Sequence, residues 1–341
     1  MTGSSSKPSN INRFEEPEDI TVIARAHQPD FADTSIVVII PTFKRPDHLR
    51  ITLQSVFDQD TRSPYAVIVM DNHPETGEGA QAAAEMLEKS KIPGIVLLAH
   101  RRGNCAAYNA GIATALANFP NATYLQIIDD DEIASPEWLK KMEQMAQQTG
   151  ADCIGAPQIP VFPDARFEKW RAHPVFMPPY KTGGTVPILY SSGNVMIKTE
   201  LLKNHGAPWL DERFNFLGGG DSDFYDRCKR DGSKFAWQPE APVDETTPAR
   251  RAELSWLNSR SFRNGSISAL IQKKAARSPA DHLSRILKSV ALLAVSPYRS
   301  FIQFLKTRSF IMALNPMNVA LGRLMMEIGF VNEQYKAAEK N

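Results

Sequence analysis

The sequence comprises 341 residues, of which 43% are hydrophobic and 23% are charged, and its formal net charge is +1 at pH 7. It is long enough to bury the core of one large or two modest domains, and its composition is ordinary for a globular protein. The near-neutral charge argues against a dedicated nucleic-acid-binding protein, because such proteins usually carry a basic excess.

The first 19 residues are rich in Ser, Pro, Asn and acidic side chains, and they lack the apolar stretch of a signal peptide. We interpret residues 1–34 as a flexible N-terminal tail. The three cysteines, Cys105, Cys153 and Cys228, form no CxxC pattern, so neither a disulfide framework nor a structural zinc site is predicted. These features together predict a cytoplasmic protein.

From Ser35 onward, short apolar runs alternate with segments of helical spacing. We expect strands at 35–40, 65–72, 95–100 and 124–130, with helices between them at 48–59, 80–90 and 104–118. This alternation predicts an α/β fold with a mainly parallel, Rossmann-like sheet flanked by helices. Ligands bind outside the carboxyl ends of the strands in such sheets. Four of these ends carry polar residues, which favours a site there: Thr42, Asp71, 100–102 and 129–131.

Three consecutive aspartates, at 129–131, follow the last of these strands. Adjacent carboxylates raise one another's pKa and oppose ionisation unless a cation, backbone N–H groups or solvent offsets the charge. A divalent metal site is one interpretation, because hard cations take oxygen ligands. A solvated turn before a helix is the other, with Ser135 followed by Pro and Glu as a typical N-cap. The residues alone leave both open.

After Gly150 the alternation weakens. The segment 157–190 is dense in Pro and aromatic residues and predicts an irregular covering of one sheet face. We expect a strand in 190–202, a glycine hinge and helix in 218–232, and another helix in 248–265. From about Ser278, basic and apolar residues alternate without a run long enough to span a bilayer. Two interpretations fit this pattern. The helices could lie at a membrane interface, with the basic residues Lys288, Arg299, Lys306 and Arg308 on them, or they could pack on the domain or on a second subunit.

Six segments, in order and spacing, resemble the large inverting glycosyltransferase family 2, which has the GT-A fold. They are SIVVIIPTFKRPDHLRITLQSVFDQ (35–59), VIVMDN (67–72), GNCAAYNAGI (103–112), IIDDDEIASPEWL (127–139), SSGNVMI (191–197) and GGGDSDFYDR (218–227). The stretch ETTPARRAELSWLNSRSFRNG (245–265) is similar to the branch that includes bacterial glucosyltransferases of succinoglycan-type exopolysaccharide assembly. The resemblance implies a GT-A domain at 35–265 and a helical C-terminal region at 266–341. It also favours the interpretation that this C-terminal region contacts a membrane.

The resemblance also implies a nucleotide-sugar donor, taken here as UDP-linked, a divalent cation (Mn²⁺ or Mg²⁺) and a single inverting displacement. Asp129 and Asp131 match the DxD motif: Asp131 is expected to contact the metal directly or through water, and Asp129 to contact the metal or the ribose. Asp130 could exchange roles with either. The cation would stabilise the leaving diphosphate. The implied acceptor is a saccharide or a polyprenyl-diphosphate-linked saccharide on the cytoplasmic face of the inner membrane, and the oligomeric state is undetermined.

Further donor contacts follow from matched positions. Asp71 matches the carboxylate that receives the uracil imide N–H, although an Asx-turn with Asn72 is an alternative. Trp256 begins a set at i, i+4 and i+7 on one helix face, which could meet the sugar and diphosphate or belong to the core. The complete set of predicted nucleotide-sugar contacts is Pro41, Thr42, Phe43, Arg45, Asp71, Arg102, Asp129, Asp130, Trp256, Arg260 and Arg263.

Asp221 matches the catalytic base, which takes the proton of the acceptor hydroxyl. Its alternative role is a helix N-cap or first-turn acid. Two positions depart from the family pattern: Gly220 stands where Glu is usual, and Tyr108 stands where Arg is usual. Many relatives have a histidine metal ligand after the strand near Val243; Asp244 and Glu245 occupy that neighbourhood here, and the resemblance leaves open whether either replaces it. A non-catalytic nucleotide-sugar-binding scaffold and a sugar-nucleotide pyrophosphorylase are the competing functions, but the loop PTFKRPD lacks the glycines that a pyrophosphorylase needs.

Overall fold

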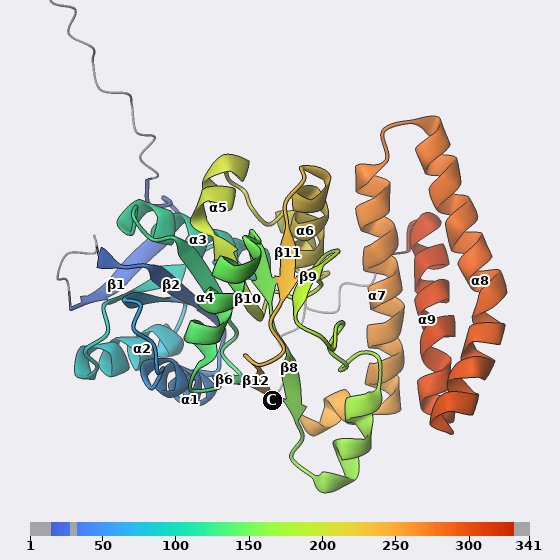
Figure 1. The fold of residues 1–341 in the computed structure, drawn as a ribbon, viewed down its shortest axis with the longest axis horizontal. Helices are drawn as coiled ribbons and strands as arrows, with labels where there is room; N and C mark the ends of the chain where they lie inside the picture. The colour runs from blue at the N-terminus through green and yellow to red at the C-terminus, as the bar shows by residue number, and fades with distance from the viewer. Residues whose placement is uncertain (1–14, 28–32, 331–341) are drawn as a thin grey trace, which may run out of the picture.

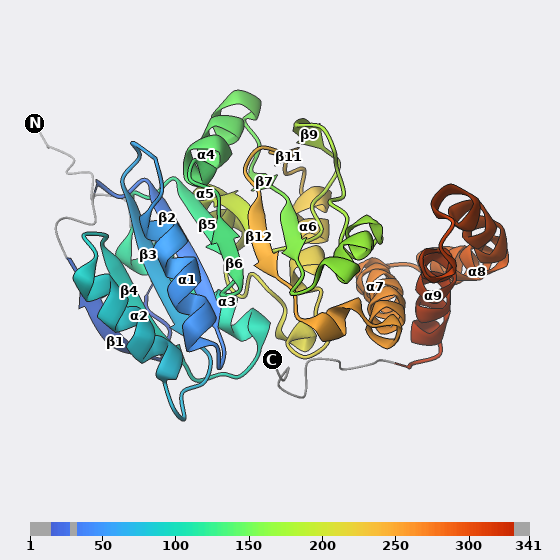
Figure 2. The same cartoon turned by 90° about the horizontal axis from the view of Figure 1, so that it is seen from below.

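A computed structural model of the chain describes residues 15–27 and 33–330. The predicted tail at 1–14 and the end of the C-terminal region at 331–341 lie outside the described residues. A nine-stranded sheet of order β1-β4-β3-β2-β5-β10-β7-β11-β9 forms the centre of the molecule, with helices on both faces (Figures 1 and 2). Three long C-terminal helices stand beside it.

The central four strands, β4-β3-β2-β5, are parallel, as the alternating pattern predicts. Every residue of β2 is buried, which explains its continuous apolar sequence. The bounds of this half are β2 (Ile36–Thr42), α1 (Pro46–Phe57), β3 (Tyr65–Asp71), α2 (Glu78–Lys89), β4 (Gly94–Ala99), α3 (Asn104–Asn118) and β5 (Tyr124–Ile128).

The second half extends the sheet with shorter, partly antiparallel strands. β10 pairs antiparallel with both β5 and β7, and a separate three-stranded sheet has the order β6-β12-β8. The segment 157–190 is largely irregular, as expected, but also contributes β8, β9 and a 3-10 helix. The bounds are β6 (Glu132–Ala134), α4 (Trp138–Thr149), β7 (Cys153–Gly155), β8 (Gln158–Val161), η2 (Ala165–Ala172), β9 (Gly184–Val186), β10 (Asn194–Lys198), α5 (Thr199–His205), η3 (Glu212–Phe214), α6 (Gly220–Arg230), β11 (Phe235–Trp237), β12 (Val243–Thr246) and η4 (Ala249–Ala252).

Three expectations are corrected. The range assigned to a flexible tail contains β1 (Ile20–Ala26), an edge strand antiparallel to β4 whose side chains alternate between half-buried and exposed. Ser135 does not cap α4: its carbonyl accepts the Trp138 N–H at 3.0 Å, so residues 135–138 form a turn, and the helix begins at Trp138 with Glu137 as its N-cap. The expected boundary at 265/266 falls inside α7 (Leu254–Ala275), which joins the domain to the C-terminal helices.

The C-terminal helices pack as a row in which α9 (Phe310–Glu327) lies between α7 and α8 (Pro279–Thr307) (Figures 1 and 2). Two glycines bring α7 and α9 into backbone contact. A Cβ on Gly265 would lie 2.0 Å from the Val319 carbonyl oxygen, and one on Gly322 would lie 1.9 Å from that of Phe262. The Ser266 hydroxyl donates to the Gly322 carbonyl across this crossing at 3.0 Å. The helical prediction for this region is confirmed up to Glu327, apart from the short links 276–278 and 308–309.

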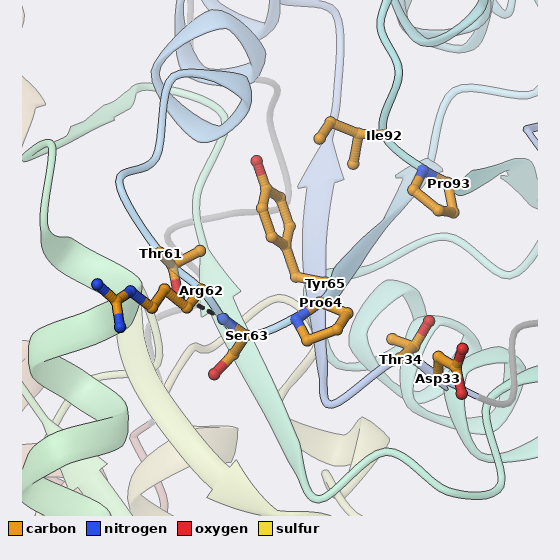
Figure 3. Close-up of a pocket in the computed structure, with 9 residues that line it drawn as sticks. All are labelled: Asp33, Thr34, Thr61, Arg62, Ser63, Pro64, Tyr65, Ile92 and Pro93. Carbon is orange, nitrogen blue, oxygen red and sulfur yellow. Dashed lines mark hydrogen bonds between the residues drawn. The ribbon is translucent and has the colours of Figure 1, made fainter.

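A cavity of about 400 Å³ lies where β2, β3 and β4 begin, and Figure 3 shows the residues that line it. Its lining comes from the segments that lead into these strands and from the first residue of β3: Asp33, Thr34, Thr61, Arg62, Ser63, Pro64, Tyr65, Ile92 and Pro93. It therefore lies at the amino edge of the parallel strands, opposite the edge at which the predicted site residues lie.

Candidate active site

The predicted site residues of the first half meet at the carboxyl edge of the parallel strands. Thr42 ends β2 and is paired in register with Asp71, which ends β3. Asp129 follows β5, the other neighbour of β2. This arrangement follows from parallel pairing, because strands that run in one direction finish at the same edge.

Asp130 is the best-anchored of the three aspartates. Its Oδ2 accepts a hydrogen bond from the Thr42 hydroxyl at 2.7 Å and from the Phe43 N–H at 3.4 Å. The guanidinium of Arg45 lies 3.3 Å from Asp130 Oδ1 and 2.7 Å from Asp131 Oδ2. Burial raises the pKa of Asp130 to about 6, against the opposing effect of Arg45. The loop after β2 thus holds the acidic cluster directly.

Asp129 has a different partner, the residue at which this chain departs from the family pattern. The hydroxyl of Tyr108, a fully buried residue of α3, donates to Asp129 Oδ1. Burial, followed by repulsion from Asp131, raises the pKa of Asp129 to about 7, whereas the Tyr108 hydrogen bond opposes this rise. The Asp129 N–H in turn donates to Glu132 Oε2 at 2.9 Å.

Two glutamates complete the cluster: Glu132, which was not predicted, and Glu245, which was noted only for lying where relatives have a histidine metal ligand. Glu132 in β6 and Glu245 in β12 are direct cross-strand partners. Burial raises the pKa of both, and repulsion from Asp131 adds to the rise for Glu245. The Arg251 guanidinium donates to Glu245 Oε1 at 2.6 Å. The position of Glu132, directly after the aspartates, was the only sequence signal for its role.

These carboxylates form an oxygen-rich, largely buried set, which is the donor chemistry that Mg²⁺ and Mn²⁺ accept. Within 15–27 and 33–330, no three His, Cys, Asp or Glu side chains are already arranged to hold a metal ion. Instead, Arg45 bridges Asp130 and Asp131. The residues fit a cation in chemical type: burial first, and repulsion between the carboxylates second, raise their pKa values, and a bound cation would favour their ionised forms.

A cationic and aromatic cluster lies next to the acidic one. The Phe43 ring meets the His73 ring edge-on, with 5.3 Å between centroids, and the Arg102 guanidinium lies 5.7 Å from the Phe43 centroid. Asn72 ties the neighbouring loops together: its side-chain N–H group donates to the Arg101 carbonyl at 2.7 Å, and its Oδ1 accepts the Gly103 N–H at 2.8 Å. Asn72 was not among the predicted site residues.

Asp71 makes the turn that was its alternative role. Its Oδ1 accepts the His73 N–H and its Oδ2 accepts the Ala80 N–H, both at 2.9 Å, so the carboxylate shapes the turn and binds the first turn of α2. The side chain is only 1% exposed, and burial raises its pKa. Contact between Asp71 and a nucleobase stays a prediction, and it would require this turn to open so that the carboxylate becomes accessible.

Asp221 lies in the first turn of α6 and is half-buried. Its Oδ1 accepts the Ser222 N–H at 2.7 Å. Burial raises its pKa, while the Ser222 N–H and then Arg260 of α7 oppose the rise. The glycine at the neighbouring position 220 is explained by the space around it. A Cβ on Gly220 would lie 2.5 Å from Cys105 Sγ, so Cys105 fills the space that a glutamate side chain would need.

Trp256 packs in the way that its alternative role predicts. Its ring stacks on Phe176 with 5.8 Å between centroids and 10° between planes, within a small apolar cluster under the 162–177 segment. The guanidiniums of Arg251 and Arg260 each lie 5.9 Å from its centroid. Arg263 on the same helix is buried. One face of the indole is therefore occupied by protein.

Residues 37–206 match the family described as Glycosyl transferase family 2. Over 235 residues the chain is 32% identical to the succinoglycan biosynthesis protein ExoM of Rhizobium meliloti (strain 1021), and the match covers 66% of this chain and 71% of that protein. The chain belongs to glycosyltransferase family 2.

This family 2 chain is also 24% identical over 264 residues to the chondroitin synthase of Pasteurella multocida (strain Pm70), of which it covers 27%. Among solved structures it is similar to the mannosyltransferase PcManGT of Pyrobaculum calidifontis in complex with GDP-Man and Mn²⁺, with a TM-score of 0.57, 16% identity and coverage of 88% of this chain and 90% of that one. The predicted GT-A fold is confirmed, and the protein is a glycosyltransferase.

Proposed function

We propose that this glycosyltransferase moves a hexosyl group from a UDP-linked donor to a hydroxyl of a saccharide or polyprenyl-diphosphate-linked saccharide, with inversion, in the cytoplasmic assembly of an exopolysaccharide. The observation that carries the proposal is the set of buried carboxylates at the carboxyl edge of the sheet, beside Phe43 and Arg102. The similarity to ExoM supports the exopolysaccharide, and PcManGT, solved with GDP-Man and Mn²⁺, supports the donor class and the cation.

Asp129 and Asp131 would hold the divalent cation, which when bound would neutralise charge on the departing diphosphate. Arg45 now pairs with Asp131 at 2.7 Å and would turn to the donor phosphates, for which its planar guanidinium is well suited. Thr42 and Phe43 would flank the nucleobase, with Arg102 close to the Phe43 ring.

The transfer itself is a displacement at the anomeric carbon. The acceptor oxygen bonds to this carbon while the bond from the carbon to the diphosphate oxygen breaks, and the hydroxyl proton passes to Asp221. Burial raises the pKa of Asp221 and so makes it a better proton acceptor than an exposed aspartate. Arg260, which opposes the rise, would keep Asp221 ionised before the reaction.

The decisive test is Asp221→Asn, with sugar transfer and donor binding measured in the same preparation. Transfer should fall by at least about a hundredfold, because the amide keeps the shape of the carboxylate but cannot take the proton. Binding of UDP-sugar with Mn²⁺ should stay nearly unchanged. Asp226→Asn, on the same helix and paired with Arg230 at 3.0 Å, is the matched control and should transfer normally.

Near wild-type transfer by Asp221→Asn would remove Asp221 from the mechanism and leave it as a helix-terminal acid. A wild-type protein that binds UDP-sugar but neither transfers nor hydrolyses it would instead support the scaffold alternative.

A further inference from the structure

The fully buried residues of helix α8 are polar, and the apolar Leu292, Leu293 and Ile302 beside them are only half-buried. Arg285, Ser289 and Ser296 are its buried residues. Arg285 forms an ion pair with Glu327 of α9, and the Ser289 hydroxyl donates to Glu327 Oε1 at 3.1 Å. An ordinary surface helix turns its apolar stripe inward and its polar face outward. In α8, by contrast, the fully buried positions are polar and most of the large apolar side chains are exposed.

The outward face of α8 is apolar along its whole length. In Figures 1 and 2, α8 is the outermost helix, on the side of α9 that faces away from the sheet. None of the elements in 15–27 or 33–330 covers this face. Its exposed large apolar side chains are Leu283, Ile286, Leu287, Val290, Val295, Tyr298, Phe301, Phe304 and Leu305. A continuous exposed surface of this kind marks an interaction site.

Cations line one edge of this apolar face. Lys288, Arg299 and Lys306 are exposed and lie eleven and seven residues apart, which is about three and two full turns, so they point in one direction. None of the three pairs with an acidic residue of the described chain. The only acid of α8, Asp281, is occupied in a capping box with Ser278.

This charge pattern selects among partners. A second copy of the chain paired through α8 would bring unpaired cations of both copies together without acids to offset them. An anionic lipid surface offers negative charge beside an apolar interior, which matches an apolar face with a cationic edge. Within 15–27 and 33–330, no helix is both long and apolar enough to cross a membrane.

We propose that α8 lies in the interface of a bilayer that contains anionic lipid, with its outward apolar face among the acyl chains and its cationic edge at the headgroups. This contact is independent of the sugar-transfer proposal, because it uses no residue of the candidate active site. It would bring the enzyme to the surface where a lipid-linked acceptor lies.

Flotation of the full chain with vesicles tests the proposal. Binding should be strong with phosphatidylglycerol and phosphatidylcholine mixtures, weaker with pure phosphatidylcholine, and reduced by salt. Leu287→Ser with Phe301→Ser, two side chains each 58% exposed, should lower binding by at least tenfold without changing the melting temperature. Ile51→Ser, 55% exposed on α1, is the matched control and should bind like the wild type.

The cationic edge is tested separately with the triple variant Lys288→Gln, Arg299→Gln and Lys306→Gln. It should lose on the order of a hundredfold in affinity for anionic vesicles at low salt, and little for neutral ones. Two outcomes would overturn the proposal: wild-type protein that stays unbound to anionic vesicles, or a dimer in solution that the Leu287 and Phe301 changes dissociate. The second outcome would assign the face to a second copy. Neither outcome would affect the Asp221 test.

Discussion

Tyr108→Phe removes one oxygen from the candidate active site, the phenol oxygen that donates to Asp129. Tyr108 is fully buried and packs in the core between α3 and the sheet, so phenylalanine should fill nearly the same volume. The hydrogen bond favours the ionised form of Asp129, whose pKa burial raises to about 7. The substitution removes the donor to Asp129 and also the hydrogen bond between Tyr108 and the Ser192 side chain.

A hydrogen bond to a charged group contributes about 1.5–3 kcal/mol. Ionisation of Asp129 should accordingly become roughly ten- to a hundredfold less favourable, since 1.4 kcal/mol is a factor of ten. A divalent cation needs the ionised carboxylate, so the affinity for UDP with Mg²⁺ should fall by a similar factor at pH 7. At pH 8.5 the proton competes less well with the cation for Asp129, so the difference in UDP affinity between Tyr108→Phe and the wild type should become smaller.

Calorimetric titration of UDP at saturating Mg²⁺ and at both pH values measures this effect. The matched control is Tyr65→Phe, which removes a hydroxyl that donates to the Val56 carbonyl at 2.8 Å, far from the acidic cluster. Equal affinities of Tyr108→Phe and the wild type at pH 7 would refute the reasoning. A loss of the same size at both pH values would also refute it, because it would point to a structural change rather than to altered ionisation.

Asp131→Ala should lower calorimetric UDP affinity with Mn²⁺ by at least tenfold at an unchanged melting temperature, and retained affinity would remove this residue from the cation site. His173 is 1% exposed, and burial lowers its pKa to about 4. The folded state thus binds fewer protons than the unfolded chain between pH 6.5 and 4, so stability is full above pH 6.5 and falls with decreasing pH. His173→Gln should remove up to about 3 kcal/mol of this dependence in urea unfolding, and an unaltered pH profile would contradict the assignment. Gly322→Ala should destabilise by about 1–3 kcal/mol, because its Cβ would lie 1.9 Å from the Phe262 carbonyl oxygen, and an unchanged unfolding midpoint would show that α7 and α9 separate freely.

The parallel half of the fold was predictable because its signals are local. The helix at 104–118 was predicted with the bounds of α3, and the strands at 65–72 and 95–100 correspond to β3 and β4 within one residue. Here apolar periodicity and polar strand ends lie within single segments. β1 was missed because its alternation is short and lies in a polar stretch that predicts a tail when considered alone.

The site was predictable in position but not in its contacts. The aspartates and the loop after the first strand were expected at one edge, yet the bridge from Arg45 to Asp130 and Asp131 spans more than eighty residues of sequence. Tyr108 was visible as a departure from the family pattern, but only the packing of α3 on the sheet reveals that its hydroxyl reaches Asp129.

The row formed by α8, α9 and α7 sets the distance between a membrane surface at α8 and the candidate active site. Packed helices lie about 8–10 Å apart between axes, and closer where glycines bring their backbones into contact, so α7 stands roughly 15 Å from α8 across α9. At the side of this row away from α8, the positive charge of Arg260 on α7 opposes the rise in the pKa of Asp221. With α8 at a membrane surface, the row becomes a spacer of fixed width, held rigid by the glycine contact between α7 and α9. Asp221 lies on α6, beyond α7, so an acceptor hydroxyl would have to stand at least that far above the bilayer to be glycosylated, and the spacer would select lipid-linked chains by their length.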